Sequence, residues 1–168
     1  MWTRIGRATT GALLLGLATW VPALAAAPAT LVRNAPLEIS FIDPFICPGA
    51  EIETTFDGKV SRTLFFDADG SERELVIDVI YVGWFTNLAT GDTVRTPGAR
   101  HIVLDFEAGL VTESGVYRLV TADGAGNVLH DSGRLVTPLE GDFEVLWEAG
   151  PHEDVLGDYG AICDALGV

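Results

Sequence analysis

The sequence has little positive charge and few of the residues that usually mark a catalytic or metal site. Ten basic residues stand against 24 acidic ones, which gives a formal net charge of −14. Because nucleic-acid binding needs clustered Lys and Arg, this balance argues against nucleic acid as a partner and disfavours anionic membrane surfaces. The chain has only three histidines and two cysteines. The cysteines have no Cys-x-x-Cys spacing, so a redox role is not indicated and we expect no cofactor.

The first 25 residues have the pattern of an export signal. Arg4 and Arg7 are followed by an apolar stretch over residues 8–21, and Ala23 and Ala25 supply the small residues that a signal peptidase requires. We therefore expect residues 1–25 to be removed and the protein to be secreted. The remaining 143 residues keep eight basic and all 24 acidic residues, a net charge of −16. Such a charge favours a dispersed monomer, and no further apolar run predicts contact with a membrane.

After the signal, residues 26–36 are small, contain proline and lack a pattern, so we expect a flexible N-terminal arm. Residues 37–168 have the length of one domain and show an alternation of apolar and polar residues that is broken by Gly, Asp and Asn. The alternation predicts strands at 37–42, 51–56, 60–66, 73–82, 93–95, 100–107, 115–121, 128–130, 134–137 and 142–148. Residues 84–87 continue the fourth strand or begin another.

These patterns predict an all-β fold, an antiparallel β-barrel or a two-sheet sandwich of about eight to ten strands. Ile102 and Leu104 alternate with polar neighbours, as expected for a sheet with one dry face. Residues 75–82 are apolar on both faces, so we expect this strand to be covered on its outer side too. Helical spacing occurs only at residues 158–166, where Ile162 and Leu166 would share one face of a short C-terminal helix. We favour the barrel over the sandwich.

The two cysteines lie near opposite ends of the domain. An exported chain with two cysteines most simply forms one disulfide, so we expect Cys47 to pair with Cys163. The bond would fix the C-terminal helix to the beginning of the sheet. Two free thiols or an intermolecular bridge are the alternatives.

Two short runs contain residues of catalytic type. His130, Asp131 and Ser132 have the residue types of a hydrolase triad, but on a strand His130 and Ser132 point to one face and Asp131 to the other, so the run cannot act as written. His152, Glu153 and Asp154 lie in a turn after a strand, where their side chains could converge on a metal or act as acid and base. A secreted hydrolase or metal-dependent enzyme using this loop is therefore the alternative function.

The favoured function is a secreted acidic β-barrel domain without enzymatic activity that binds a small apolar ligand or an extracellular partner. Aromatic residues on the expected strands could line the site, and we select Tyr81, Trp84, Phe106 and Trp147 as its candidates. A packed core is the simpler explanation of the same residues. A third possibility is a structural protein that presents an exposed apolar patch to a partner.

Five short segments, together with the export signal, resemble a family of small secreted actinobacterial proteins rich in β-structure. They are DPFICP at 43–48, FTNLATG at 85–91, DSGRL at 131–135, EAGPH at 148–152 and AICDAL at 161–166. The resemblance spans most of the chain after the signal. It implies export and a compact β domain. Since the family has no assigned activity, it transfers no site residues.

Overall fold

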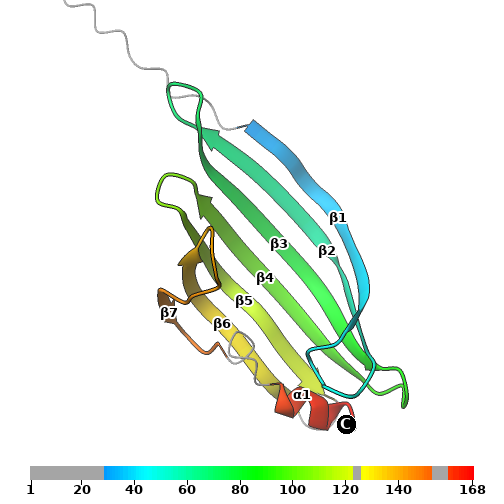
Figure 1. The fold of residues 1–168 in the computed structure, drawn as a ribbon. Coiled ribbons are helices and arrows are strands. Elements are labelled where there is room, and N and C mark those ends of the chain that lie inside the picture. The colour runs from blue at the N-terminus through cyan, green and yellow to red at the C-terminus, as the bar shows by residue number, and fades with distance from the viewer. Residues whose placement is uncertain (1–28, 123–125, 153–158) are drawn as a thin grey trace, which may run out of the picture.

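The computed structural model describes residues 29–122, 126–152 and 159–168 as one antiparallel sheet and a short helix (Figure 1). Each strand pairs with the next strand along the chain, so the spatial order is the chain order. The all-β class and the short C-terminal helix expected from the sequence are confirmed. The elements are β1 (Ala29–Asp43), β2 (Ile52–Phe66), β3 (Glu72–Asn87), β4 (Thr93–Asp105), β5 (Leu110–Ala122), β6 (Gly126–Pro138), β7 (Trp147–Ala149) and α1 (Gly160–Ala165).

The sheet is open, so the expected closure into a barrel is not present in the described part of the chain. Its edges are β1 and β7, and β7 has only three residues. Residues 142–148 were expected to form a full strand, which could have closed the sheet, but only the last two of them belong to β7. The preceding segment is held against the β4–β5 turn and β6, because the Leu139 amide donates to the Gly109 carbonyl and the Leu146 amide to the Val136 carbonyl.

The strands are fewer and longer than the sequence predicted, because several glycines expected in turns lie inside strands. The predicted strands 51–56 and 60–66 are one strand, β2, with Gly58 opposite Tyr81 in the middle of its pairing with β3. A Cβ on Gly58 would lie 2.2 Å from the carbonyl oxygen of Ile80. Gly58 is therefore required by close cross-strand packing rather than by a turn. Likewise, Gly98 and Gly133 lie within β4 and β6.

The expected flexible arm is also different in the structure. Residues 29–36 form the first half of β1, where Ala35 pairs with Val60 and Pro36 with Lys59. Proline is compatible with this position because β1 is an edge strand, which leaves some of its backbone donors without a partner. Residues 1–28, which include the expected signal, lie outside the described residues.

The two faces of the sheet differ in burial. On β3, Tyr81, Phe85 and Asn87 are buried on one face, which we call the inner face, whereas Ile80 on the outer face is 67% exposed. The expectation that residues 75–82 are covered on both sides is therefore wrong for the described structure. In the described part of the chain, β1 and β7 are the two edges of a single sheet, and no second sheet covers its outer face.

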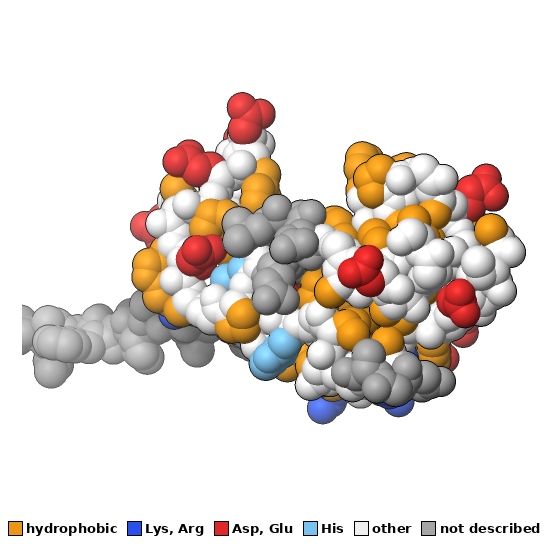
Figure 2. Space-filling model, turned by 90° about the horizontal axis from the view of Figure 1, so that it is seen from below, with side chains coloured by type: hydrophobic (Ala, Val, Ile, Leu, Met, Phe, Trp, Pro, Cys, Tyr) orange, Lys and Arg blue, Asp and Glu red, His pale blue; other side chains and the backbone are white. Residues whose placement is uncertain are grey.

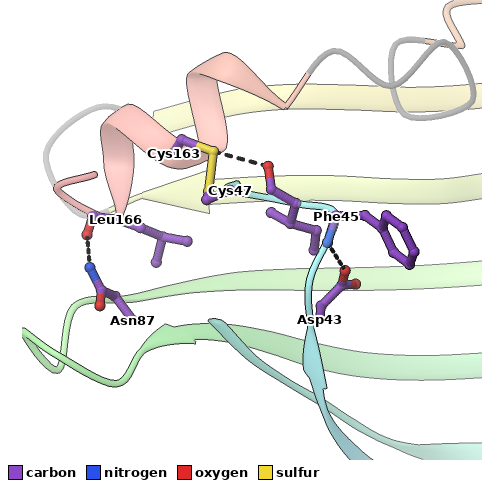
Figure 3. Close-up of a disulfide and its surroundings, with 7 residues drawn as sticks. Asp43, Phe45, Cys47, Asn87, Cys163 and Leu166 are labelled. Atoms are coloured by element: carbon purple, nitrogen blue, oxygen red, sulfur yellow. Dashed lines mark hydrogen bonds between the residues drawn. A yellow bond between two sulfur atoms is a disulfide. The ribbon is translucent and has the colours of Figure 1, made fainter. Parts of the chain in front are cut away.

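One end of the inner face is closed by α1 and by the loop that follows β1 (Figure 3). Cys47 in the loop is bonded to Cys163 in α1, as the sequence predicted. Ile162 and Leu166 are both fully buried, which confirms that they share the packed face of the helix. Around the disulfide lies the main hydrophobic core, composed of Ile46, Cys47, Ile52, Phe85, Val94, Val120, Leu129, Ile162 and Leu166.

Polar contacts fix the same end of the sheet. The buried Asn87 side chain at the end of β3 donates from Nδ2 to the Leu166 carbonyl oxygen at 3.0 Å. Its Oδ1 accepts from the Ala89 amide at 3.0 Å, so one side chain joins the β3–β4 turn to the helix end. On the opposite side, Asp43 Oδ1 accepts from the Phe45 amide at 2.9 Å, which bends the chain out of β1 (Figure 3).

Candidate ligand pocket

A cavity of about 370 Å³ lies on the inner face of the sheet. This volume falls within the usual range of small-ligand sites, roughly 300–1,000 Å³. Strands β1 to β6 all contribute to its wall. The lining residues are Leu37, Ile39, Phe56, Val79, Tyr81, Arg100, Glu113, Tyr117, Arg118, Leu135 and Phe143.

The aromatic part of the pocket lies over glycines. A Cβ on Gly83 would lie 2.5 Å from Cδ1 of Phe56, and a Cβ on Gly98 would lie 2.3 Å from Cζ of Tyr81. The Phe56 and Tyr81 rings meet edge to face with their centroids 5.1 Å apart. The absence of a side chain at each glycine lets a ring lie close to the backbone of the neighbouring strand.

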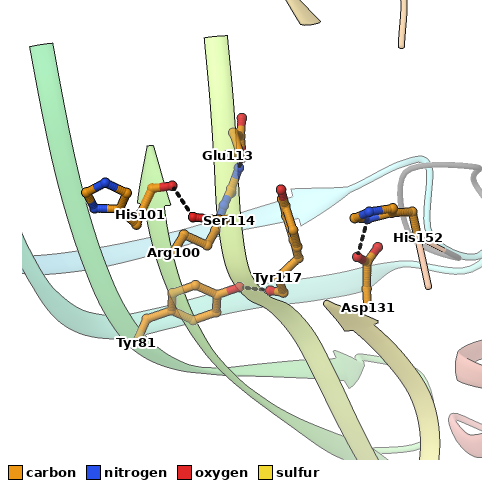
Figure 4. A network of polar contacts seen from close by, with 8 residues as sticks. All are labelled: Tyr81, Arg100, His101, Glu113, Ser114, Tyr117, Asp131 and His152. Carbon is orange, nitrogen blue, oxygen red and sulfur yellow. Dashed lines mark hydrogen bonds and ion pairs between the residues drawn. The ribbon is translucent and has the colours of Figure 1, made fainter. Parts of the chain in front are cut away.

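A shift in strand register brings two adjacent residues of β5 to the same cavity. The pairing of β5 with β6 is regular from Leu110 to Val116 and is displaced between Val116 and Arg118. In a regular strand neighbouring side chains point to opposite faces, whereas at a bulge this alternation is broken. Tyr117 and Arg118 consequently both line the pocket. The Tyr81 hydroxyl donates to the Tyr117 carbonyl oxygen and so holds the displaced backbone (Figure 4).

The polar part of the pocket is built around Arg100 on β4. Its guanidinium forms an ion pair with the carboxylate of Glu113 on β5 and lies 5.2 Å from the ring centroid of Tyr117. Burial lowers the pKa of Arg100, but the hydrogen bond and the negative charge of Glu113 outweigh it and raise the pKa. Arg100 is therefore a permanent cation in a partly buried position.

Tyr117 is the most enclosed polar residue of the pocket, with 5% of its surface exposed. Burial and, next, the nearby charge of Glu113 raise the pKa of the phenol to about 12, so it keeps its proton at neutral pH. Among the described residues, neither the Tyr117 hydroxyl nor Nε of Arg100 donates to an acceptor, although both are buried. Buried polar groups in folded proteins are rarely left in this state.

The four aromatic residues expected to bind a ligand do not form one site. Tyr81 lines the pocket. Trp84 alternates with the buried Gly83 and Phe85 on β3, so it lies on the outer face. Phe106 follows the end of β4, where its amide donates to the Arg73 carbonyl. Trp147 lies on β7, with the guanidinium of Arg134 5.6 Å from its ring.

The His152 loop has a different geometry from the one the sequence suggested. His152 is 4% exposed, and its Nδ1 lies 3.2 Å from Oδ1 of the buried Asp131 (Figure 4). Glu153 and Asp154 lie outside the described residues. In the part of the chain that is described, no group of three His, Cys, Asp or Glu residues could hold a metal ion. His152 does not line the inner-face pocket, so the geometry gives no support to a hydrolytic role.

The His130–Ser132 run follows the strand alternation. His130 Nε2 and Ser132 Oγ lie 3.0 Å apart on an exposed surface, whereas Asp131 points to the other side and is completely buried. The three residues are thus divided between the faces of β6, as the sequence argument required.

The pocket's polar residues were missed at the level of sequence, although one signal was present. Arg100 lies on the same side of β4 as the apolar residues Ile102 and Leu104, which have the same parity along the strand. An arginine on an otherwise dry face is a sign of a functional or paired group. No comparable signal marks Tyr117, because its position depends on the bulge in β5.

A second depression, of about 430 Å³, lies around Asp57, Lys59, Asp78 and Ile80. It is larger, but these four residues are all exposed, and none of the buried groups without a partner in the described part of the chain lines it. Acidic side chains are scattered over the visible surface in Figure 2, with few basic ones among them. The inner-face pocket is therefore the stronger site candidate, since it combines apolar walls with buried donors.

Fold and pocket together define an open, meandering antiparallel β-sheet protein with a ligand-sized cavity on its inner face. No protein-family model, curated protein or solved structure matches the chain. No helix within the described ranges has the length and apolar character needed to cross a membrane.

Proposed function

We propose that the protein is a secreted binding domain that holds a small, largely apolar ligand in the inner-face pocket. The observation that carries the proposal is a cavity of about 370 Å³ whose walls combine apolar side chains with buried, unpartnered donors. A packed core would have filled this space and paired these groups. Binding is also consistent with the exposed Ile39 and Phe143 at its margin, because bound ligand would cover apolar surface there.

Export is part of the same proposal. The signal pattern of residues 1–25 supports it, and so does the bond between Cys47 and Cys163, since disulfides persist mainly in oxidising compartments. On this proposal the protein shares its secreted β-rich plan with the actinobacterial family that its sequence resembles.

Native mass spectrometry of protein purified from its own host tests the binding function. A co-purifying small molecule, or displacement of a fluorescent apolar probe by lipids, is the expected result. A ligand-free mass together with failure of every lipid to displace the probe would contradict it.

A matched pair of substitutions on β3 locates the binding site. Val79→Phe places a larger side chain in the pocket and should abolish binding, because Val79 is part of the cavity wall. Val76→Phe makes the same change on the outer face of the same strand and should leave binding intact. Equal effects of both variants would show that the ligand binds elsewhere.

A further inference from the structure

The two edges of the sheet differ in length. Strand β7 has only three residues, whereas β1 has 15 and lies at the other edge with β2 as its single partner strand (Figure 1). In the described sheet, the backbone groups of β1 that face away from β2 therefore have no strand to bond to. Natural sheets usually protect such an edge with a proline, a bulge, a lysine or a covering segment, because it can pair with another chain.

Only the first half of β1 has this protection. Its register with β2 is irregular between Thr30 and Ala35, where Asn34 has a positive φ of 49°. Pro36, which follows, lacks an amide donor. Residues 37–43, in contrast, pair with β2 in regular register and contain no proline or lysine. This second half, which we call the open edge, has the backbone regularity that an additional strand requires.

Apolar side chains are exposed along the open edge and just after it. Phe41 and Ile42 are exposed on opposite faces of β1, and Phe45 in the following loop is 78% exposed. Side chains on neighbouring strands contact each other when they share a face. A strand added beside the open edge would therefore cover Phe41 on the inner face and Ile42 on the outer face.

The charge around the open edge selects the kind of partner. The open edge pairs with residues 52–58 of β2, and every charged residue in these two segments is acidic: Glu38, Asp43, Glu53 and Asp57. Glu38 lies directly opposite Asp57, and Glu53 has the same parity as Asp57 along β2, so these three carboxylates share the outer face. Like charges opposite each other destabilise a sheet, and a cation on the adjoining strand would offset this.

We propose that the open edge of β1 binds an extended basic segment of another protein as an added strand. Its lysine or arginine side chains would lie beside Glu38 on the outer face, and its apolar side chains beside Phe41 on the inner face. Backbone hydrogen bonds would supply affinity, and the alternating side chains specificity. This surface is separate from the proposed ligand function.

A second copy of the chain is a poorer occupant of the open edge. It would bring the same three carboxylates to the contact, in a chain whose net charge is −14. Lys59 lies opposite Pro36, outside the open edge, so it does not change the acidic character of the segment itself. Complementary charge across an interface favours the correct partner, whereas juxtaposed like charges disfavour the wrong one.

Three synthetic peptides test the inference. Lys-Val-Lys-Val-Lys-Val-Lys has the alternation of the proposed partner, Glu-Val-Glu-Val-Glu-Val-Glu reverses its charge, and Lys-Val-Lys-Pro-Lys-Val-Lys keeps the charge but interrupts the strand. Fluorescence anisotropy of the labelled peptides with the disulfide-bonded protein should show the first binding at least tenfold more tightly than the other two. Hydrogen exchange should show new protection of residues 37–43 by the first peptide and none in β7.

A matched pair of variants tests the position of the contact. Glu38→Lys should weaken the lysine–valine peptide about fivefold, because an attractive cross-strand pair becomes a repulsive one. Glu72→Lys makes the same change in net charge on an exposed residue opposite Phe66, at the β2–β3 hairpin, and should leave binding unchanged. Val79→Phe, which fills the ligand pocket, should also leave it unchanged, so the two proposals can fail separately.

Several results would overturn the inference. Equal binding of the valine and proline versions of the lysine peptide would show charge attraction without strand pairing. Equal effects of Glu38→Lys and Glu72→Lys, or protection outside residues 37–43 alone, would place the contact elsewhere. Absence of binding by all three peptides would contradict a basic partner. A concentration-dependent dimer with protected residues 37–43, measured by sedimentation and hydrogen exchange without peptide, would assign the open edge to a second copy.

Discussion

The ring of Tyr81 on β3 covers Gly98 on β4 so closely that a Cβ at Gly98 would lie 2.3 Å from Cζ of the tyrosine. The ring also meets Phe56 edge to face and donates its hydroxyl proton to the Tyr117 carbonyl. Three features of the pocket therefore depend on Gly98. They are the position of the Tyr81 ring against β4, its contact with Phe56 and the bulged backbone of β5.

Gly98→Ala should destabilise the protein by about 1–3 kcal/mol, since the new methyl group displaces the Tyr81 ring. Urea unfolding followed by tryptophan fluorescence measures the loss. In a Tyr81→Leu background the same substitution should cost clearly less, because the closest atoms are gone. Additive effects of the two substitutions would show that the ring does not set the requirement for glycine.

Removal of the disulfide in the Cys47→Ser/Cys163→Ser variant should lower the free energy of unfolding by about 3–5 kcal/mol. The bond spans a sequence separation of 116 residues, and a long loop gains much freedom in the unfolded chain when it is released. Urea unfolding of the variant, compared with the chemically reduced native protein, measures this. A loss below about 1 kcal/mol in both would contradict a stabilising role.

Asn87→Ala should cost about 1–3 kcal/mol, because it leaves the buried Leu166 carbonyl and the Ala89 amide without their side-chain partner. Thr86→Ala is the matched control on the adjacent residue. Its hydroxyl contacts the Thr93 hydroxyl at the surface, so a change within about 0.5 kcal/mol is expected. Thermal unfolding of the two variants compares them directly, and similar losses would argue against the helix contact as the cause.

Alkaline pH should weaken the native protein through Tyr117. Its folded pKa is raised from 10.0 to about 12, chiefly by burial. Because the raised pKa belongs to the folded state, the contribution is fully present below pH 10 and is lost as the pH rises towards 12. The difference in stability between native protein and Tyr117→Phe should therefore shift by up to about 2–3 kcal/mol across this interval. Phenolate absorbance of the two proteins measures the titration, and a Tyr117 step near 10 would contradict the shift.

The sequence was sufficient for the parts of this fold that depend on local pattern. Alternation identified an antiparallel all-β chain, and the contexts of Cys47 and Cys163 identified the bond between its ends. The spacing of Ile162 and Leu166 identified the buried side of α1. Each of these depends on residues close in sequence or, for the cysteines, on there being only one possible intramolecular pair.

The features of the fold and the site that the sequence did not predict depend on contacts between strands. The sequence does not distinguish a glycine in a turn from a glycine in close contact with the neighbouring strand. The prediction therefore interrupted β2 at Gly58 and β4 near Gly98, although both strands are continuous in the structure. Closure of the sheet depended on residues 142–146, whose alternation suggested a strand but which lie outside β7. The site was missed mainly because Tyr117 lies at a bulge, where alternation no longer says which face a side chain occupies.

The position of the disulfide at one end of the sheet implies a gradient of local stability along every long strand. The disulfide, α1 and the main core all lie at the end where β3 finishes at Asn87, whereas the β2–β3 hairpin lies at the other end (Figure 1). Amide hydrogens near Ile52 and Phe85 should therefore exchange only with global unfolding. Those near Leu64 and Leu75, on the same two strands, should exchange through smaller openings that leave the disulfide-bonded end folded. Strands β2 and β3 thus each have one half that opens only with global unfolding and one half that opens more easily. The pocket lies between these halves.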